Sequence, residues 1–111
     1  MNRYKLFQAG VDVNEALERL GGDKALYEDL LTHFKESPRF TNLLKAMEDN
    51  DTKEAFQLAH ALKGTAGNLS FNRLFDSLQP LVEALREGNM ELAKANLSQV
   101  EVSYQILLEA L

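Results

Sequence analysis

The sequence predicts an all-α fold, an antiparallel four-helix bundle with short additional N-terminal helices. Three observations support this fold class. Only two prolines and six glycines interrupt the 111 residues, and apolar side chains recur every three to four positions, which is the helical period. No segment alternates apolar and polar residues as a half-buried strand does. The turns between the helices are short, and short turns between long amphipathic helices favour antiparallel neighbours.

Capping residues delimit the first two expected helices. The first, residues 12–20, has Asp12 at its N-cap and Glu15 as the capping-box partner three positions later. Gly21-Gly22 ends it, because glycine accepts the left-handed backbone conformation of a helix end. The next helix, residues 23–36, carries an apolar stripe made of Tyr27, Leu30, Leu31 and Phe34.

The same signals delimit the following two helices. Ser37-Pro38 predicts an N-cap followed by a proline in the first helical turn, and this helix extends to about Asn50. Asp51 should cap a further helix, with Glu54 at the capping-box position. We expect that helix to cover residues 51–70, with a core stripe made of Ala55, Ala59, Leu62, Ala66 and Leu69.

Two leucine-rich helices complete the expected bundle. One starts near Asn72 and is closed by Gly88. Pro80 lies inside it and should either kink the helix or remove one backbone hydrogen bond. Asn89 should cap the last helix, which continues to Leu111. Because one bundle can bury all of these stripes, we expect a single domain over residues 1–111 and a monomer.

The composition limits the partners and the location. A net charge of −5 should repel nucleic-acid phosphates, so nucleic acid is not an expected partner. No cysteine is present, which excludes disulfides and thiolate metal sites. No stretch approaches the roughly 18 apolar residues of a membrane helix, and the first residues lack the apolar run of a signal peptide. We therefore expect a cytoplasmic protein that does not bind membranes.

One face of helix 51–70 differs from an ordinary solvent-exposed surface. His60 lies off the core stripe and should point outward. Four further residues share its face at helical spacing. They are Gln57, Lys63, Gly64 and Gly67. The residue types on this face suit the binding and transfer of a phosphoryl group.

The two glycines on this face are costly, at roughly 1 kcal/mol each relative to alanine inside a helix. Access explains them, because without side chains at Gly64 and Gly67 a partner's backbone can approach His60 closely. Close helix packing or a kink is the alternative explanation. Phe56 and Phe71 border the face, either as an apolar rim for partner docking or as the edge of the core.

The chemistry of phosphoryl transfer requires a nucleophile and a compensating cation. An exposed imidazole such as His60 is mostly neutral and nucleophilic near pH 7. Lys63, one turn further along, can offset the charge of a phosphoryl group by a charge-assisted hydrogen bond. Gln57 can offer an amide donor from the other side.

At these residues the sequence resembles the histidine-containing phosphotransfer (HPt) family. The resemblance rests on the run Ala59-His60-Ala61-Leu62-Lys63-Gly64-Thr65-Ala66-Gly67-Asn68-Leu69, which matches the family pattern His-x-Leu-Lys-Gly followed by small residues. Leu17-Glu-Arg-Leu-Gly-Gly-Asp23 and Leu30-Leu-Thr-His-Phe-Lys35 also resemble the family's first helices. Ser70 departs from the pattern, because many relatives have glycine there.

The resemblance implies a four-helix bundle that carries one phosphorylatable histidine. It implies that His60 is the phosphoacceptor, Lys63 the partner of the phosphate charge and Gly64 a docking glycine. The implied partners are receiver domains of response regulators or hybrid sensor kinases, which would supply the phospho-aspartate and Mg²⁺. The chain itself would have no cofactor, no ATP site and no kinase activity of its own.

Three rival functions were weighed against this one. An adaptor bundle without phosphoryl chemistry would have replaced the histidine, and His60 is present. The second rival is a hydrolytic or metal-dependent enzyme. A helical di-metal site needs Glu-x-x-His pairs, and neither His33 nor His60 has a glutamate three residues before it. A Ser-His-Asp arrangement stays open, although no nucleophile elbow is present. A sensor-kinase dimerisation domain would need an ATP-binding segment, which we do not find. His33 has no carboxylate or histidine arranged around it and is expected to be structural.

Overall fold

A computed structural model describes all 111 residues, and helices make up about 80% of the chain. The all-α prediction is confirmed, and the only strand-like feature is an isolated antiparallel bridge between Val11 and Phe71. The helices are α1 (Arg3–Gln8), α2 (Val13–Arg19), α3 (Lys24–Glu36), α4 (Arg39–Glu48), α5 (Thr52–Asn68), α6 (Asn72–Arg86) and α7 (Met90–Ala110).

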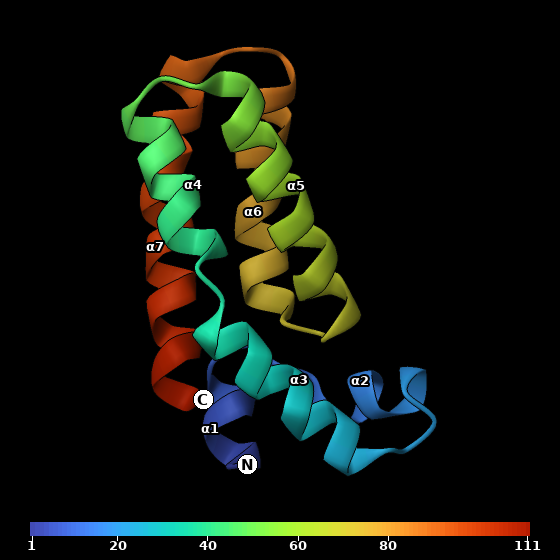
Figure 1. Ribbon diagram of the computed structural model, residues 1–111. Coiled ribbons are helices and arrows are strands. Elements are labelled where there is room, and N and C mark those ends of the chain that lie inside the picture. Colours follow the sequence, from blue (N-terminus) through green and yellow to red (C-terminus); the bar gives the residue numbers. More distant parts are fainter.

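Helices α4 to α7 form the four-helix bundle, and α1 to α3 lie at one end of it, beside the C-terminal end of α7 (Figure 1). Helix α4 packs against α5, α5 against α6, and α6 against α7. The molecule is elongated, with extents of 40 × 21 × 20 Å. The predicted bundle with short N-terminal helices therefore describes the architecture.

The capping predictions are confirmed at three helix starts. The side chains of Asp12, Asp51 and Asn89 each accept a hydrogen bond from the backbone N–H three residues later, at 3.0–3.1 Å. The reciprocal half of each predicted capping box is wrong. The Asp12 N–H donates to the Ser70 carbonyl and the Asp51 N–H to the Ala46 carbonyl, so neither needs a glutamate side chain.

Three element boundaries differ from the prediction. Helix α1 was not expected, because only one of its six residues, Leu6, is buried, and that is too short a pattern to recognise. Pro38 rather than Ser37 is the N-cap of α4, although the Ser37 hydroxyl accepts from the Arg39 N–H at 3.3 Å. Helix α5 ends at Asn68, because Ser70 has a left-handed φ of 58° that cannot continue a helix.

The core runs through the centre of the bundle and includes the predicted stripe of α5. Ala55, Ala59, Leu62, Ala66 and Leu69 are all buried. Pro80 lies inside α6, as the sequence required, and has no N–H to donate there. No buried side-chain nitrogen or oxygen lacks a hydrogen-bond partner. The packing therefore holds one side of α5 against the bundle and leaves the other side to solvent.

Candidate functional site

Helix α5 places His60 on the surface of the bundle. Its buried stripe turns toward α4 and α6, and His60 is exposed on the other side, as the periodicity predicted. The imidazole makes no hydrogen bond within the chain, so both of its ring nitrogens are open to a partner. A neutral imidazole in this position has one unprotonated nitrogen with which to attack an electrophile.

An aromatic ring orients the imidazole. The half-buried ring of Phe56, one turn earlier on α5, stacks on His60 with a centroid distance of 5.5 Å and an angle of 30° between the rings. The guanidinium carbon of Arg86 lies 5.2 Å from the Phe56 centroid. A cation, an aromatic ring and the imidazole thus follow one another, which restrains the imidazole without engaging its nitrogens.

Lys63 lies on the α6 side of this face. Its ammonium nitrogen is 5.4 Å from the centroid of the Phe75 ring, a cation–π contact of modest strength. Lys63 forms no ion pair with any carboxylate, so its positive charge is not neutralised within the chain. Gln57 is exposed and makes no hydrogen bond within the chain. Both side chains are therefore free to meet an anionic group near His60.

The two glycines on this face have different surroundings. A Cβ atom at Gly64 would meet nothing within 4 Å, whereas a Cβ atom at Gly67 would lie 3.3 Å from Cε2 of Phe75. Close helix packing against Phe75 thus accounts for glycine at position 67, which is the alternative explanation that the sequence left open. At Gly64 no contact within the chain requires glycine. Its docking role, like that of Gly67 and Phe56, stays a prediction.

Phe71 does not belong to the rim of this site. It is 1% exposed and packs edge-to-face against Phe34, with centroids 4.9 Å apart. Of the two roles that the sequence allowed for Phe71, the core is the observed one. Phe71 therefore adds no side chain to the surface around His60, and the space at Gly64 on that surface is open.

A family model described as Hpt domain matches residues 12–111. The chain belongs to the Hpt domain family. No protein with a curated description and no solved structure matches it. Hpt domains are helical bundles that take part in histidine phosphotransfer in phosphorelays, and they interact with receiver domains.

The match leaves out the first eleven residues of the chain. They contain α1 and the segment around Val11 that pairs with Phe71, so this N-terminal segment is an addition to the matched part. It contacts the turn that follows α5, where the Asn72 N–H donates to the Gly10 carbonyl at 2.9 Å. No helix of the molecule has the length and apolarity needed to cross a membrane.

The C-terminal end of α5 is held by residues that the sequence patterns did not indicate. Arg19 of α2 donates to the carbonyls of Gly67 and Asn68, at 3.2 and 2.8 Å, and to the Ser70 hydroxyl at 3.0 Å. The Ser70 hydroxyl in turn donates to the Glu15 carboxylate at 2.8 Å. These bonds satisfy carbonyls that every helix end leaves without partners. They also show that the Ser70 hydroxyl links Arg19 to Glu15.

Tyr27 of α3 completes this anchor. Its buried hydroxyl donates to the Leu69 carbonyl at 2.8 Å. Burial raises the pKa of Tyr27 to about 12, the Asp12 carboxylate adds to the rise, and Arg19 opposes it. The phenol therefore stays protonated and remains a donor well above neutral pH. Spacing alone could not have indicated this contact, because 42 residues separate Tyr27 from Leu69.

Proposed function

We propose that His60 accepts a phosphoryl group from the phospho-aspartate of one receiver domain and passes it to an aspartate of another. The observation that carries the proposal is an exposed histidine without an internal hydrogen-bond partner, one helical turn from open space at Gly64, in an Hpt domain. The donor receiver would belong to a hybrid sensor kinase or a response regulator.

The chemical step balances without a base on this chain. The unprotonated ring nitrogen of His60 attacks phosphorus, the N–P bond forms, and the bond between phosphorus and the aspartate oxygen breaks. The aspartate leaves as a carboxylate, and the other ring nitrogen keeps its proton. Onward transfer reverses these events on a second receiver. Mg²⁺ would be held by the receiver, and this chain would bind no cofactor.

Lys63 and Gln57 would assist from the two sides of His60. The ammonium of Lys63 would leave the Phe75 ring, or shift along it, to meet the equatorial oxygens of the transferring group, where charge accumulates. The Gln57 amide would donate one further hydrogen bond. Gly64 would allow the receiver backbone to come within van der Waals distance of α5.

The test is phosphoryl transfer from a panel of phosphorylated receiver domains to the purified chain. Wild type should acquire an acid-labile, base-stable label, and His60→Gln should acquire none. His33→Gln is the matched control, because His33 is the only other histidine and its Nδ1 is bound to the Asp29 carbonyl at 2.8 Å. A His60→Gln protein that still becomes labelled would exclude His60 as the acceptor.

A second pair of variants tests the role of Lys63. Lys63→Ala should slow transfer about three- to tenfold, because one charge-assisted contact to the phosphoryl group is lost. Lys53→Ala, which removes an exposed lysine nearly three turns earlier on the same helix, should leave the rate unchanged. Equal slowing by both variants would indicate a general charge effect and would contradict a specific role for Lys63.

A further inference from the structure

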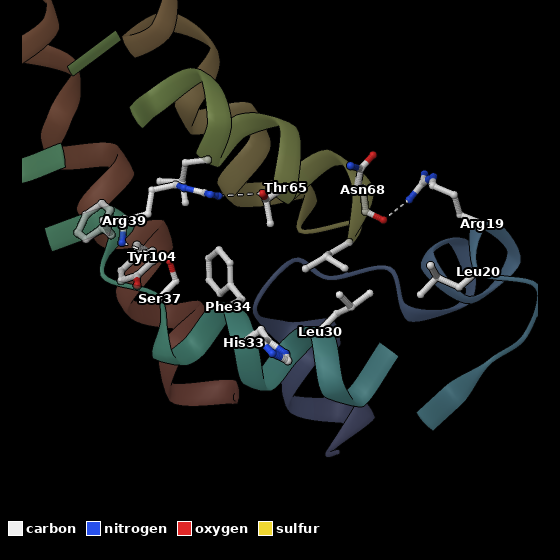
Figure 2. A pocket seen from close by; sticks show the side chains of 13 residues that line it. Arg19, Leu20, Leu30, His33, Phe34, Ser37, Arg39, Thr65, Asn68 and Tyr104 are labelled. Carbon is white, nitrogen blue, oxygen red and sulfur yellow. Dashed lines mark hydrogen bonds between the residues drawn. The ribbon is translucent and has the colours of Figure 1, made fainter. Parts of the chain in front are cut away.

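A cavity of about 680 Å³ opens on the other side of α5 from His60. Leu62 and Thr65 of α5 and its C-cap Leu69 line one wall, and Thr65 lies about 140° around the helix from His60 at 100° per residue. Helix α3, the C-terminal end of α2, the start of α4 and Tyr104 of α7 supply the remaining walls (Figure 2). Its volume lies within the range of about 300–1,000 Å³ that is typical of small-molecule sites.

The lining combines an apolar interior with cations and contains no acid. Seven of its thirteen residues are hydrophobic, and the titratable ones are Arg19, His33, Arg39 and Tyr104, none of them an acid that is charged at neutral pH. The chain as a whole has 17 acidic and 12 basic residues. The cavity lining, with two arginines and no carboxylate, therefore has the opposite sign of charge to the whole chain. The local charge therefore favours an anion, although the molecule carries a net charge of −5.

Two side chains at one end of the cavity have donors to spare. The Arg39 guanidinium donates to the Thr65 hydroxyl at 3.2 Å, forms no ion pair, and has further N–H groups available. The Tyr104 hydroxyl has no hydrogen-bond partner within the chain. Burial raises the pKa of Tyr104, so the phenol keeps its proton and can donate. Arg39 and Tyr104 could thus bind one anionic head group together.

The opposite end is less available to an anion. Arg19 is occupied by the carbonyls at the end of α5 and lies 3.5 Å from the Glu15 carboxylate. Between the two arginines, Figure 2 shows the side chains of Phe34 and Leu30, with Leu20 beside Arg19, all lining the cavity. An occupant anchored at Arg39 would therefore extend an apolar body toward these side chains.

We propose that this cavity binds a small organic anion, a molecule with one carboxylate head group at Arg39 and Tyr104 and an apolar body between α3 and α5. The head group would receive charge-assisted hydrogen bonds from Arg39, and the body would displace water from an apolar surface. The site shares none of the residues proposed for phosphotransfer, so either proposal can fail without the other.

The experiment is a titration of the isotope-labelled full chain, followed by amide NMR, with octanoate, decanoate and 1-naphthoate. We expect saturable binding with a dissociation constant on the order of 10–100 µM for the best of them. The shifted amides should cluster at Arg39, Thr65, Leu69 and Tyr104, and that of Gly64 should move least. No saturable binding up to about 5 mM, or shifts centred elsewhere, would overturn the proposal.

Two comparisons isolate the head group. Arg39→Gln should weaken decanoate binding about tenfold or more, whereas Arg3→Gln, at an exposed position on α1, should leave it unchanged. Decanol, which has the same body without the charge, should bind wild type and Arg39→Gln alike. Equal affinity of wild type for decanoate and decanol, or no effect of Arg39→Gln, would overturn the anionic part of the proposal.

A variant that fills the cavity gives an independent test. Leu30→Trp, at a half-buried position of the apolar end, should abolish binding of decanoate and decanol together. Circular dichroism and thermal unfolding would establish that the variant is folded. Undiminished decanoate binding by folded Leu30→Trp would place the ligand outside the cavity and overturn the assignment.

Discussion

Different kinds of contact stabilise the surface around His60 and the C-terminal end of the same helix, α5. Around His60, the contacts are stacking ones, from Phe56 to the imidazole and from Lys63 to Phe75, and the imidazole has no internal hydrogen bond. At the end of α5, hydrogen bonds from Arg19 and Tyr27 engage three successive carbonyls.

The difference indicates how this chain can combine a fixed position with a free reactive group. The anchor acts on the backbone of α5, so the helix cannot easily shift relative to the bundle. The imidazole itself keeps both nitrogens free for changing partners. A site on a rigid element keeps its geometry without any bond to the reacting atom.

The largest expected effect comes from filling the open surface. Gly64→Leu should slow phosphoryl transfer about tenfold or more, because the new side chain occupies the space through which a receiver backbone would approach. Stability should not fall, since leucine is the better helix former by somewhat under 1 kcal/mol. Transfer kinetics together with urea unfolding would measure both. Ala95→Leu, at an exposed position on α7, is the control, and a normal rate in Gly64→Leu would contradict a docking surface there.

The next effect concerns the anchor. Tyr27→Phe leaves the Leu69 carbonyl without its partner and should lower the free energy of unfolding by about 1–2 kcal/mol near pH 7. Urea unfolding measures this change. Tyr4→Phe, at a side chain that is 70% exposed, should change nothing. If Tyr27→Phe were as stable as wild type, the bond at the helix end would not contribute to the anchor.

The raised pKa of Tyr27 predicts how the free energy of unfolding depends on pH. The pKa of Tyr27 is about 12 in the folded protein, above the ordinary value of 10.0. Folded protein therefore holds this proton more tightly than unfolded protein does. The contribution of the protonated Tyr27 phenol to the free energy of unfolding is complete below pH 10. It is lost as the pH rises from 10 to 12. Tyr27→Phe should lose less stability than wild type across that window, with a weaker slope remaining from Tyr104, whose pKa is also raised.

The smallest effect separates the two glycines. Gly64→Ala should raise the free energy of unfolding by about 0.5–1 kcal/mol, because its Cβ atom meets open space. Gly67→Ala should gain less or nothing, because Phe75 would have to move by a few tenths of an ångström. Urea unfolding of both variants measures the difference. An equal gain in both would show that Phe75 yields freely and that packing does not require glycine at 67.

The periodicity of α5 was enough to place its main residues. The stripe from Ala55 to Leu69 is buried, and His60 is exposed, because a helix repeats every 3.6 residues whatever surrounds it. Local spacing was less reliable where a side chain had distant partners to choose from. Glu15 has the right spacing for a capping box with Asp12, but it accepts from Ser70 and pairs with Arg19 instead.

By itself, the sequence determined six of the seven helices, the caps Asp12, Asp51 and Asn89, the core stripe of α5 and the exposed face of His60. These features depend on contacts within one or two turns, which a short pattern encodes. Only the tertiary structure decided that Arg19 and Tyr27 hold the end of α5, that Gly67 packs on Phe75, and that a cavity with Arg39 opens between α3 and α5. Those features depend on how whole helices are placed, which is the sum of many small packing contributions and not the property of any one segment.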